Sequence, residues 1–254
     1  HNRYPAEWAR VNREALEEAG AMGEAVFFMR AGYTGSSRYS TSTWAGDQLV
    51  NWSVHDGLPS VIPAALSSGY CGTGLHHSDI GGFTTVAWVR RSKELFQRWA
   101  EHAAFTPIMR NHEGNRPGRN WQFNSDAETL SHLARMTGVY TRLAPYHRHV
   151  VGEYAASGLP AMRHLGIHYG DDETAHRQRY QYLYGRDLLV APVVQQKRSS
   201  WSAYLPEDEW VHLWSGRAAA PGWHRESAPI GYPPVYYRRS SEFAELFASF
   251  SKDT

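Results

Sequence analysis

Strand-like and helix-like segments alternate along the first 186 residues of this chain. Short apolar runs predict strands at residues 26–29, 39–44, 70–75 and 159–169. Apolar residues at helical spacing predict helices at 5–21, 57–68, 92–105, 126–157 and 174–184. Such alternation is typical of parallel βαβ units rather than of separate helical and sheet domains. Four units make half of an eight-stranded (β/α)8 TIM barrel, so the predicted fold class is α/β.

The pattern changes after residue 186. Short β-prone stretches alternate with turn residues and show no helical periodicity, and they lie at residues 188–194, 201–206, 209–216 and 233–239. This pattern is typical of a small antiparallel β-sandwich. We therefore predict two domains, the barrel part at residues 1–186 and a C-terminal β-sandwich domain at residues 187–254.

Polar residues recur where the predicted barrel strands end. Arg30 follows the first strand, Asp47 the second, and His77 and Asp79 the third. In (β/α) barrels the active site lies at the carboxyl ends of the strands, which makes this recurrence informative. Asp47 can be catalytic or can form a structural ion pair with Arg30 or Arg38, and the sequence leaves both open.

The composition excludes several classes of function. The 26 basic and 25 acidic residues give a net charge of +1, so we expect neither nucleic acid nor an anionic membrane as a partner. Cys71 is the only cysteine, which rules out an internal disulfide and multi-thiolate metal sites and suits the cytoplasm. No apolar run approaches the roughly 20 residues that span a bilayer, and no signal-peptide pattern is present.

A metal site is the less favoured interpretation of the histidine pair. His76, His77 and Asp79 are possible ligands, but consecutive histidines point in different directions. A hydrogen-bonded, glycine-rich turn explains them better, so we predict no metal. The 10 tryptophans can stack on sugar rings or can simply fill the core.

Five motifs in a fixed order resemble those of glycoside hydrolase family 31, the retaining α-glycosidases built on a (β/α)8 barrel with attached β-domains. They are WAGD at 44–47, HSDIGG at 77–82, FTPIMRNH at 105–112, GLPAMR at 158–163 and GRDLLVAPV at 185–193. Within the family, GDQ at 46–48, HEGNRP at 112–117 and NWQF at 120–123 look most like the sulfoquinovosidases. The resemblance implies the C-terminal half of the barrel, units five to eight, followed by a β-domain.

The resemblance assigns a role to several residues. Asp47 matches the family's general acid/base, a carboxyl that protonates the glycosidic oxygen and then activates water. Arg30 matches the arginine before the acid/base loop, and Trp44 matches an aromatic residue of the pocket wall. Asp79 and His112 match residues that hydrogen-bond the cleaved sugar.

Two substitutions distinguish this chain from common family patterns. Gln48, a candidate substrate-binding residue, stands where asparagine is commoner in the family, and the glutamine looks like that of the sulfoquinovosidases. Phe83 stands where those enzymes are expected to have a tyrosine whose hydroxyl helps to hold the sulfonate. A phenylalanine cannot donate that hydrogen bond, so Phe83 leaves the sulfonate specificity open.

A retaining mechanism also needs a second carboxylate roughly 5 Å from the first. In the family this aspartate ends the fourth barrel strand, so the resemblance places the nucleophile upstream of His1, about twenty residues before it. Without the family, Asp79 would be the natural partner of Asp47. We therefore expect the isolated chain to be inactive, and to aggregate or to pair with an upstream half because a half-barrel has open edges.

The expected function is a retaining α-glycoside hydrolase that needs no cofactor. Its substrate would be a small-molecule α-glycoside, either a sulfoquinovoside of glycerol type or a glucoside, and a homo-oligomer is possible. The alternative within the family is an α-glucosidase or α-xylosidase. The alternative of another class is a non-catalytic carbohydrate-binding or scaffold fragment.

Overall fold

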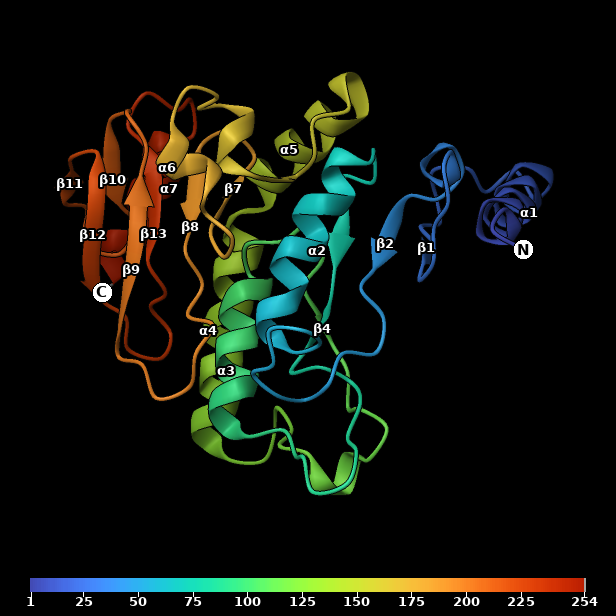
Figure 1. The fold of residues 1–254 in the computed structure, drawn as a ribbon, viewed down its shortest axis with the longest axis horizontal. Helices are drawn as coiled ribbons and strands as arrows, with labels where there is room; N and C mark the ends of the chain where they lie inside the picture. Colours follow the sequence, from blue (N-terminus) through green and yellow to red (C-terminus); the bar gives the residue numbers. More distant parts are fainter. Residues whose placement is uncertain (254) are drawn as a thin grey trace.

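Parallel strands and covering helices form the first part of the molecule (Figure 1). The computed structural model describes residues 1–253. The strands are β1 (Phe28–Met29), β2 (Ser42–Trp44), β3 (His76–His77), β4 (Asp79–Ile80) and β5 (Arg110–Asn111). β1, β2 and β3 form one parallel sheet, and β4 pairs in parallel with β5. The predicted α/β class and the barrel part are confirmed.

The helices of this part are α1 (Tyr4–Glu18), α2 (Leu58–Tyr70), α3 (Lys93–Ala103), α4 (Ala127–Arg142) and α5 (Ala144–Ser157), with short 3-10 turns η1 (Ser36–Arg38) and η2 (Pro117–Arg119). Ser92 Oγ caps α3 by accepting from Leu95 N at 3.2 Å. Asp126 caps α4 in the same way, accepting from Thr129 N at 2.7 Å. The helix predicted at 126–157 is divided at Leu143 into α4 and α5.

Antiparallel strands form the second part. They are β6 (Met162–Arg163), β7 (Tyr182–Tyr184), β8 (Leu188–Val190), β9 (Ser200–Leu205), β10 (Trp210–His212), β11 (Ala218–Ala219), β12 (Gly222–Ser227) and β13 (Val235–Arg238). One sheet has the order β11-β10-β13-β8-β7-β6, and β12 pairs with β9. Leu189, Ala203 and Trp210 belong to the buried cluster shared by both sheets, so the predicted antiparallel sandwich is confirmed.

Short helical segments complete the second part. They are η3 (Leu165–Ile167), α6 (Glu173–His176), α7 (Ala244–Ala248) and η4 (Ser249–Asp253). The domain division between residues 186 and 187 stays a prediction. β7 precedes this position and β8 follows it within one sheet.

Two predicted barrel strands are wrong in position. The strand predicted at 70–75 lies later, because α2 runs to Tyr70 and β3 begins at His76. The strand predicted at 159–169 is reduced to β6, which pairs antiparallel with β7 rather than in parallel with a barrel strand. The last parallel strand is β5 instead, and it follows β3 and β4, which are separated by Ser78 alone. Its residues Arg110 and Asn111 are polar, so an apolar pattern could not reveal it.

The helix predicted at 174–184 is also wrong in its second half. α6 ends at His176, and Tyr182–Tyr184 form β7. All three β7 side chains are buried, which is typical of a strand covered on both faces.

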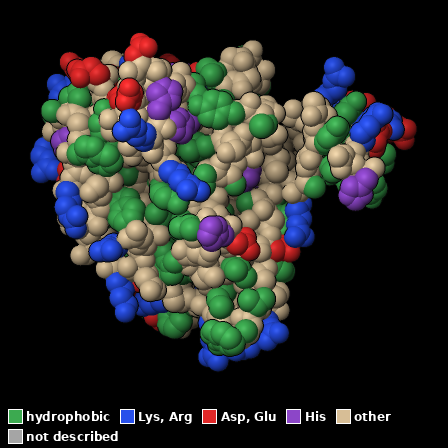
Figure 2. Space-filling view, viewed as in Figure 1, with side chains coloured by type: hydrophobic (Ala, Val, Ile, Leu, Met, Phe, Trp, Pro, Cys, Tyr) green, Lys and Arg blue, Asp and Glu red, His purple; other side chains and the backbone are tan. Residues whose placement is uncertain are grey.

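α1 and β1 lie at the end of the molecule away from the β12–β9 sheet (Figure 1). Ion pairs such as Arg13 with Glu17 cover α1, and Figure 2 shows its charged side chains at the right of the view. Ala9 is the buried residue of α1, and Tyr4 and Trp8 are exposed. Among the described strands β1 has one neighbour, β2, so one of its edges is unpaired.

Candidate active site

Asp47 lies on the loop after β2, beside the residue that follows β1. Arg30 Nη2 lies 2.9 Å from Asp47 Oδ2, and both side chains contact solvent, with 60% of Arg30 and 28% of Asp47 exposed. Gly46 has φ +89°, and a Cβ on it would lie 3.4 Å from Arg30 Nε. The glycine therefore gives the loop a left-handed turn against the arginine. Parallel pairing of β1 with β2 brings the two chain segments together.

The backbone of the Asp47 loop is held by the loop that follows β4. Thr84 Oγ1 donates to Asp47 O at 2.8 Å, and the amides of Phe83 and Thr84 donate to Gln48 O at 2.9 and 2.8 Å. Gly82 has φ +75°, and a Cβ on it would lie 3.1 Å from Gln48 O. This close approach of two backbones requires glycine, which explains the second glycine of the HSDIGG motif.

Gln48 is a buried residue that supports the loop from inside. Its Nε2 donates to Ala45 O at 2.6 Å, and its Oε1 has no hydrogen-bond partner among the described residues. The side chain thus braces the turn that presents Asp47. The sequence predicted it as a substrate-binding residue, and that role stays a prediction.

Asp79 and Arg110 form a second carboxylate–arginine pair. Arg110 Nη1 donates to Asp79 Oδ1, and the two residues face each other across the β4–β5 register. Asp79 is fully buried, whereas 27% of Arg110 is exposed. Burial raises the pKa of Asp79, and the charges of Arg110 and His112 oppose that rise. Sequence reasoning missed this pair because it depends on β5.

Trp44 lies between the two pairs. The centre of its ring is 5.5 Å from Arg30 Cζ and 5.2 Å from Arg110 Cζ. Trp44 Nε1 and Asp79 Oδ2 are buried, and the indole N–H lies close enough to the Asp79 carboxyl to lower its pKa. Because this contact falls short of full hydrogen-bond geometry, both atoms keep the capacity to pair with a hydroxyl group of a ligand.

The side chains of His112 and Phe83 pack against each other. Their rings are edge to face with centroids 4.9 Å apart, and His112 Nδ1 accepts from Gly114 N at 3.0 Å. That acceptor role leaves the proton of the neutral ring on Nε2, available as a donor. The structure therefore brings these predicted residues to the carboxyl ends of β4 and β5.

His76 and His77 point to opposite sides of β3, as consecutive strand residues do. His77 packs edge to face on Phe28, with centroids 4.8 Å apart, and neither ring nitrogen has a partner within residues 1–253. Burial lowers the pKa of His76 and of His77 to about 4, so both rings are neutral at pH 7. In the described part of the chain, no group of three or more acidic, His or Cys side chains is arranged to hold a metal ion.

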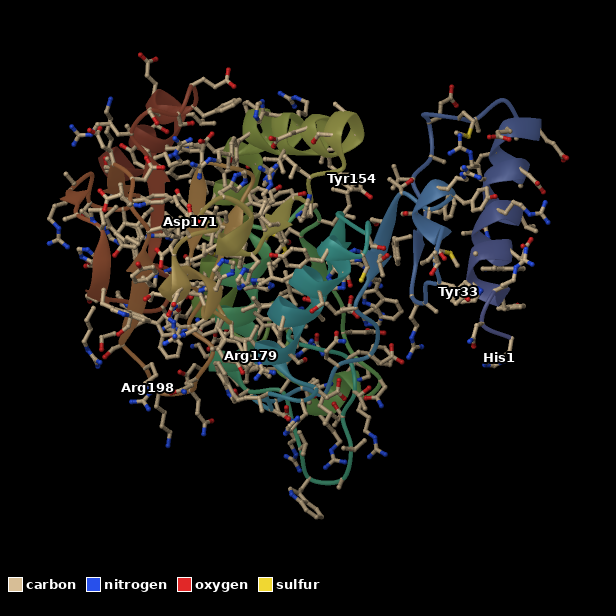
Figure 3. The ribbon with its side chains drawn as sticks, turned by 45° about the horizontal axis from the view of Figure 1, so that its top comes forward. His1, Tyr33, Tyr154, Asp171, Arg179 and Arg198 are labelled. Carbon is tan, nitrogen blue, oxygen red and sulfur yellow. The ribbon has the colours of Figure 1, made fainter. Side chains whose placement is uncertain are left out.

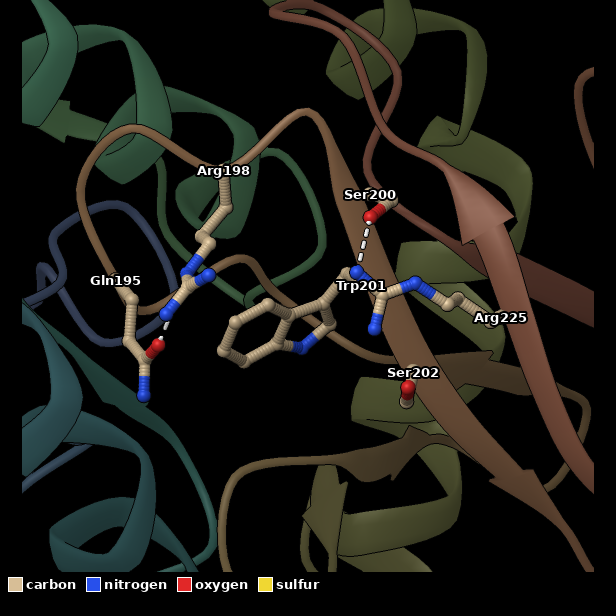
Figure 4. A pocket seen from close by; sticks show the side chains of 6 residues that line it. All are labelled: Gln195, Arg198, Ser200, Trp201, Ser202 and Arg225. Carbon is tan, nitrogen blue, oxygen red and sulfur yellow. Dashed lines mark hydrogen bonds between the residues drawn. The ribbon is translucent and has the colours of Figure 1, made fainter.

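One cavity borders this site, and a second cavity lies far from it. One of about 740 Å³ borders Arg30 and Trp44 and extends along α2. Another of about 300 Å³ lies on β9 and β12, where Trp201, Arg198 and Arg225 line it (Figure 4). Figure 3 shows Arg198 and Tyr33, three residues after Arg30, at opposite ends of the molecule. The second cavity is therefore separate from Asp47.

Family models match most of the chain. The description "Glycosyl hydrolases family 31 TIM-barrel domain" matches residues 1–149, and "Glycosyl hydrolase family 31 C-terminal domain" matches residues 158–241. Across residues 1–253, every helix is too short or too polar to cross a membrane.

Curated relatives and a solved structure are similar over nearly the whole chain. The sulfoquinovosidase of Escherichia coli strain K12 is 61% identical over 98% of this chain, and that of Agrobacterium fabrum is 49% identical over 97%. A family 31 sulfoquinovosidase from E. rectale, solved with an aza-sugar inhibitor, has a TM-score of 0.98 and 52% identity and covers all of the chain. The chain spans 37% to 38% of the length of these proteins.

Proposed function

Because this chain belongs to glycoside hydrolase family 31, we propose that it supplies the general acid/base and part of the sugar subsite of a retaining α-glycosidase. The observation that carries this proposal is the position of Asp47. Its carboxyl is solvent-accessible, paired with Arg30 at 2.9 Å, and close to the half-buried Trp44 and the buried Asp79. An acid/base must reach both a substrate oxygen and water, and an accessible carboxyl at the strand ends does so.

Asp47 acts twice in the proposed mechanism. In the first step its carboxyl donates a proton to the glycosidic oxygen as the bond to the anomeric carbon breaks and the aglycone leaves as an alcohol. In the second step the carboxylate takes a proton from water as the water oxygen attacks the anomeric carbon, and the bond between that carbon and the enzyme nucleophile breaks, which releases the sugar and restores the nucleophile's carboxylate. Arg30 keeps the carboxylate oriented between these steps through the ion pair of its Nη2 with Asp47 Oδ2.

The nucleophile of the first step is proposed to lie outside these 254 residues. Asp79 is poorly suited, because Arg110 holds one of its oxygens and burial raises its pKa, which disfavours the ionised form that attacks. We propose instead that Asp79 and His112 bind sugar hydroxyls, Asp79 through Oδ2, the oxygen that Arg110 does not hold, and His112 through Nε2.

The proposed substrate is an α-sulfoquinovoside of glycerol type. The two curated relatives named sulfoquinovosidase, at 61% and 49% identity, support this choice. Phe83 favours the second candidate, an α-glucosidase or α-xylosidase, because its ring has no hydroxyl to donate to a sulfonate. The two candidates differ at the sixth carbon of the sugar and share the same acid/base step.

A complete site is proposed to need another part of the protein. The unpaired edge of β1 and the exposed Tyr4 and Trp8 of α1 are suited to being covered by further barrel elements. We therefore propose that the isolated chain is inactive. A cytoplasmic location, which the single exposed Cys71 favours, and a homo-oligomer also remain proposals.

The test is a hybrid in which this chain replaces the matching C-terminal part of the E. coli sulfoquinovosidase. We expect the hybrid to hydrolyse an aryl α-sulfoquinovoside faster than the matching α-glucoside and α-xyloside, and the isolated chain to hydrolyse none of them. A hybrid that unfolds cooperatively but prefers the glucoside or xyloside would favour the second candidate. Turnover by the isolated chain that is lost in D47N would contradict the proposed need for an outside nucleophile.

A further inference from the structure

A buried arginine that is not among the predicted site residues hydrogen-bonds the loops that carry those residues. Arg91 lies between β4 and α3 and is 2% exposed. No carboxylate of the described residues lies in direct ion-pair contact with it, although burying a cation without such a contact is costly, and the charge of Asp79 favours its charged form from a distance. Burial lowers the pKa of Arg91 to about 10, so the guanidinium stays charged at pH 7.

The guanidinium donates to acceptors on three separate loops. Nη1 reaches Ile80 O at 3.1 Å, Gly82 O at 3.3 Å and His112 O at 2.8 Å. Nη2 reaches Glu113 O at 3.0 Å and Gln122 Oε1 at 2.9 Å, and Nε reaches Trp121 O at 2.8 Å. Together these acceptors satisfy all five N–H groups of the guanidinium. They take the place of a counter-ion in direct contact.

The acceptors are next to the residues proposed to bind the sugar. Ile80 directly follows Asp79, and His112 is itself an acceptor through its carbonyl. Gly81 leaves room for this arrangement, because a Cβ on it would lie 2.3 Å from Arg91 Cδ. The first glycine of the HSDIGG motif therefore admits the arginine, as the second admits the Asp47 loop.

We propose that Arg91 is a positioning residue that fixes Asp79 and His112 relative to each other by joining the ends of β4 and β5. This inference rests on the proposed function of those two residues. A lysine cannot replace it, since an ammonium has three donors and no planar fork.

Arg98 provides a matched control. It is also 2% exposed, and it donates to the carbonyls of Arg198 and Ala228, both at 2.7 Å, while Glu101 pairs with it. It joins α3 to the β-sandwich rather than the loops of the site. Replacing either arginine removes a buried network, and only Arg91 contacts the sugar-binding loops.

The experiment compares R91K and R98K in the hybrid described above. A displacement near 1 Å can cost about 100-fold in rate, so we expect R91K to lower kcat/KM on the aryl α-glycoside by roughly 30-fold or more. R98K should lower it by less than about threefold at a similar loss of Tm. Hydrogen exchange should be roughly tenfold faster at the amides of Phe83 and Gly114 in R91K and unchanged in R98K.

The same experiment separates the two proposals. If both variants lose kcat/KM equally, or if exchange at Phe83 and Gly114 is unchanged in R91K, the positioning role is overturned. If the unsubstituted hybrid hydrolyses no glycoside, the proposed function fails while the exchange result still decides the role of Arg91. Should R91K not fold, Q122M removes the half-buried Oε1 acceptor of Arg91, together with the Nε2 bonds to Glu113 O and Pro117 O, and should produce a smaller change in the same direction.

Discussion

Two carboxylate–arginine pairs lie at the strand ends, and their exposure separates their roles. Asp47 and Arg30 are 28% and 60% exposed, whereas Asp79 is fully buried against Arg110. Trp44 contacts the guanidinium groups of both pairs. The accessible pair can exchange protons with substrate and water, and the buried pair can hold a fixed geometry. On the proposed function, the accessible pair therefore takes part in the chemistry and the buried pair in positioning.

The largest expected effect is the loss of turnover in D47N. Removal of a general acid/base typically costs 10²–10⁴-fold in rate, so kcat of the hybrid should fall by about that factor on a glycoside with a poor leaving group. Tm should change little because the Asp47 side chain is accessible. Kinetics and thermal unfolding of the same preparation check this, and a loss of Tm as large as that of D79N would remove the distinction between the pairs.

The effect on the free energy of unfolding should be larger for the buried pair than for the accessible pair, the reverse of the order expected for turnover. D79N breaks a buried charge-assisted hydrogen bond and should lower the free energy of unfolding by about 1.5–3 kcal/mol. R30M removes an exposed ion pair and should change it by about 1 kcal/mol or less. Urea unfolding of the hybrid measures both. Equal losses would contradict the assignment of the fixed role to Asp79.

Acid should destabilise the protein because two buried histidines, His76 and His102, resist protonation in the folded state. Burial lowers the pKa of His76 to about 4 and that of His102 to about 3, below the value near 6.5 in an unfolded chain. Between those values the unfolded chain binds protons that the folded chain does not. The free energy of unfolding should therefore fall as the pH drops from about 6.5 toward 4, by roughly 2 kcal/mol per histidine at pH 5.

Urea unfolding of the hybrid at pH 7 and pH 5 measures this dependence. H76Q removes one of the titrating groups and should reduce the difference between the two pH values. A difference that is the same in H76Q would show that other groups cause it.

The smallest expected effect concerns specificity. F83Y adds a phenolic hydroxyl beside His112, where the family resemblance places a sulfonate contact. One hydrogen bond to a charged group is worth about 1.5 kcal/mol, so kcat/KM for an aryl α-sulfoquinovoside should rise by about tenfold. F83Y should leave kcat/KM for the matching α-glucoside unchanged. The control variant F123Y, which adds a hydroxyl to an exposed ring, should leave kcat/KM for both substrates unchanged. A gain on both substrates would contradict a sulfonate contact.

The sequence predicted the parts of the site that follow apolar strands. Arg30 and Asp47 end recognisable β-prone segments, and the structure places them 2.9 Å apart. It could not predict the Asp79–Arg110 pair, because Arg110 lies on a two-residue polar strand that only its neighbour β4 defines. Arg91 was equally hidden, since its acceptors are backbone carbonyls, which carry no sequence signal. Pairing and backbone position are tertiary properties that one chain's pattern does not encode locally.

The most direct test of the account is how the effect of D47N depends on the leaving group. An aryl α-glycoside with an acidic phenol needs little protonation to depart, whereas an alkyl glycoside needs a full proton. The account predicts that D47N in the hybrid loses far more kcat/KM on the alkyl glycoside than on the activated aryl glycoside. An equal loss on both substrates would contradict the assignment of Asp47 as the proton donor.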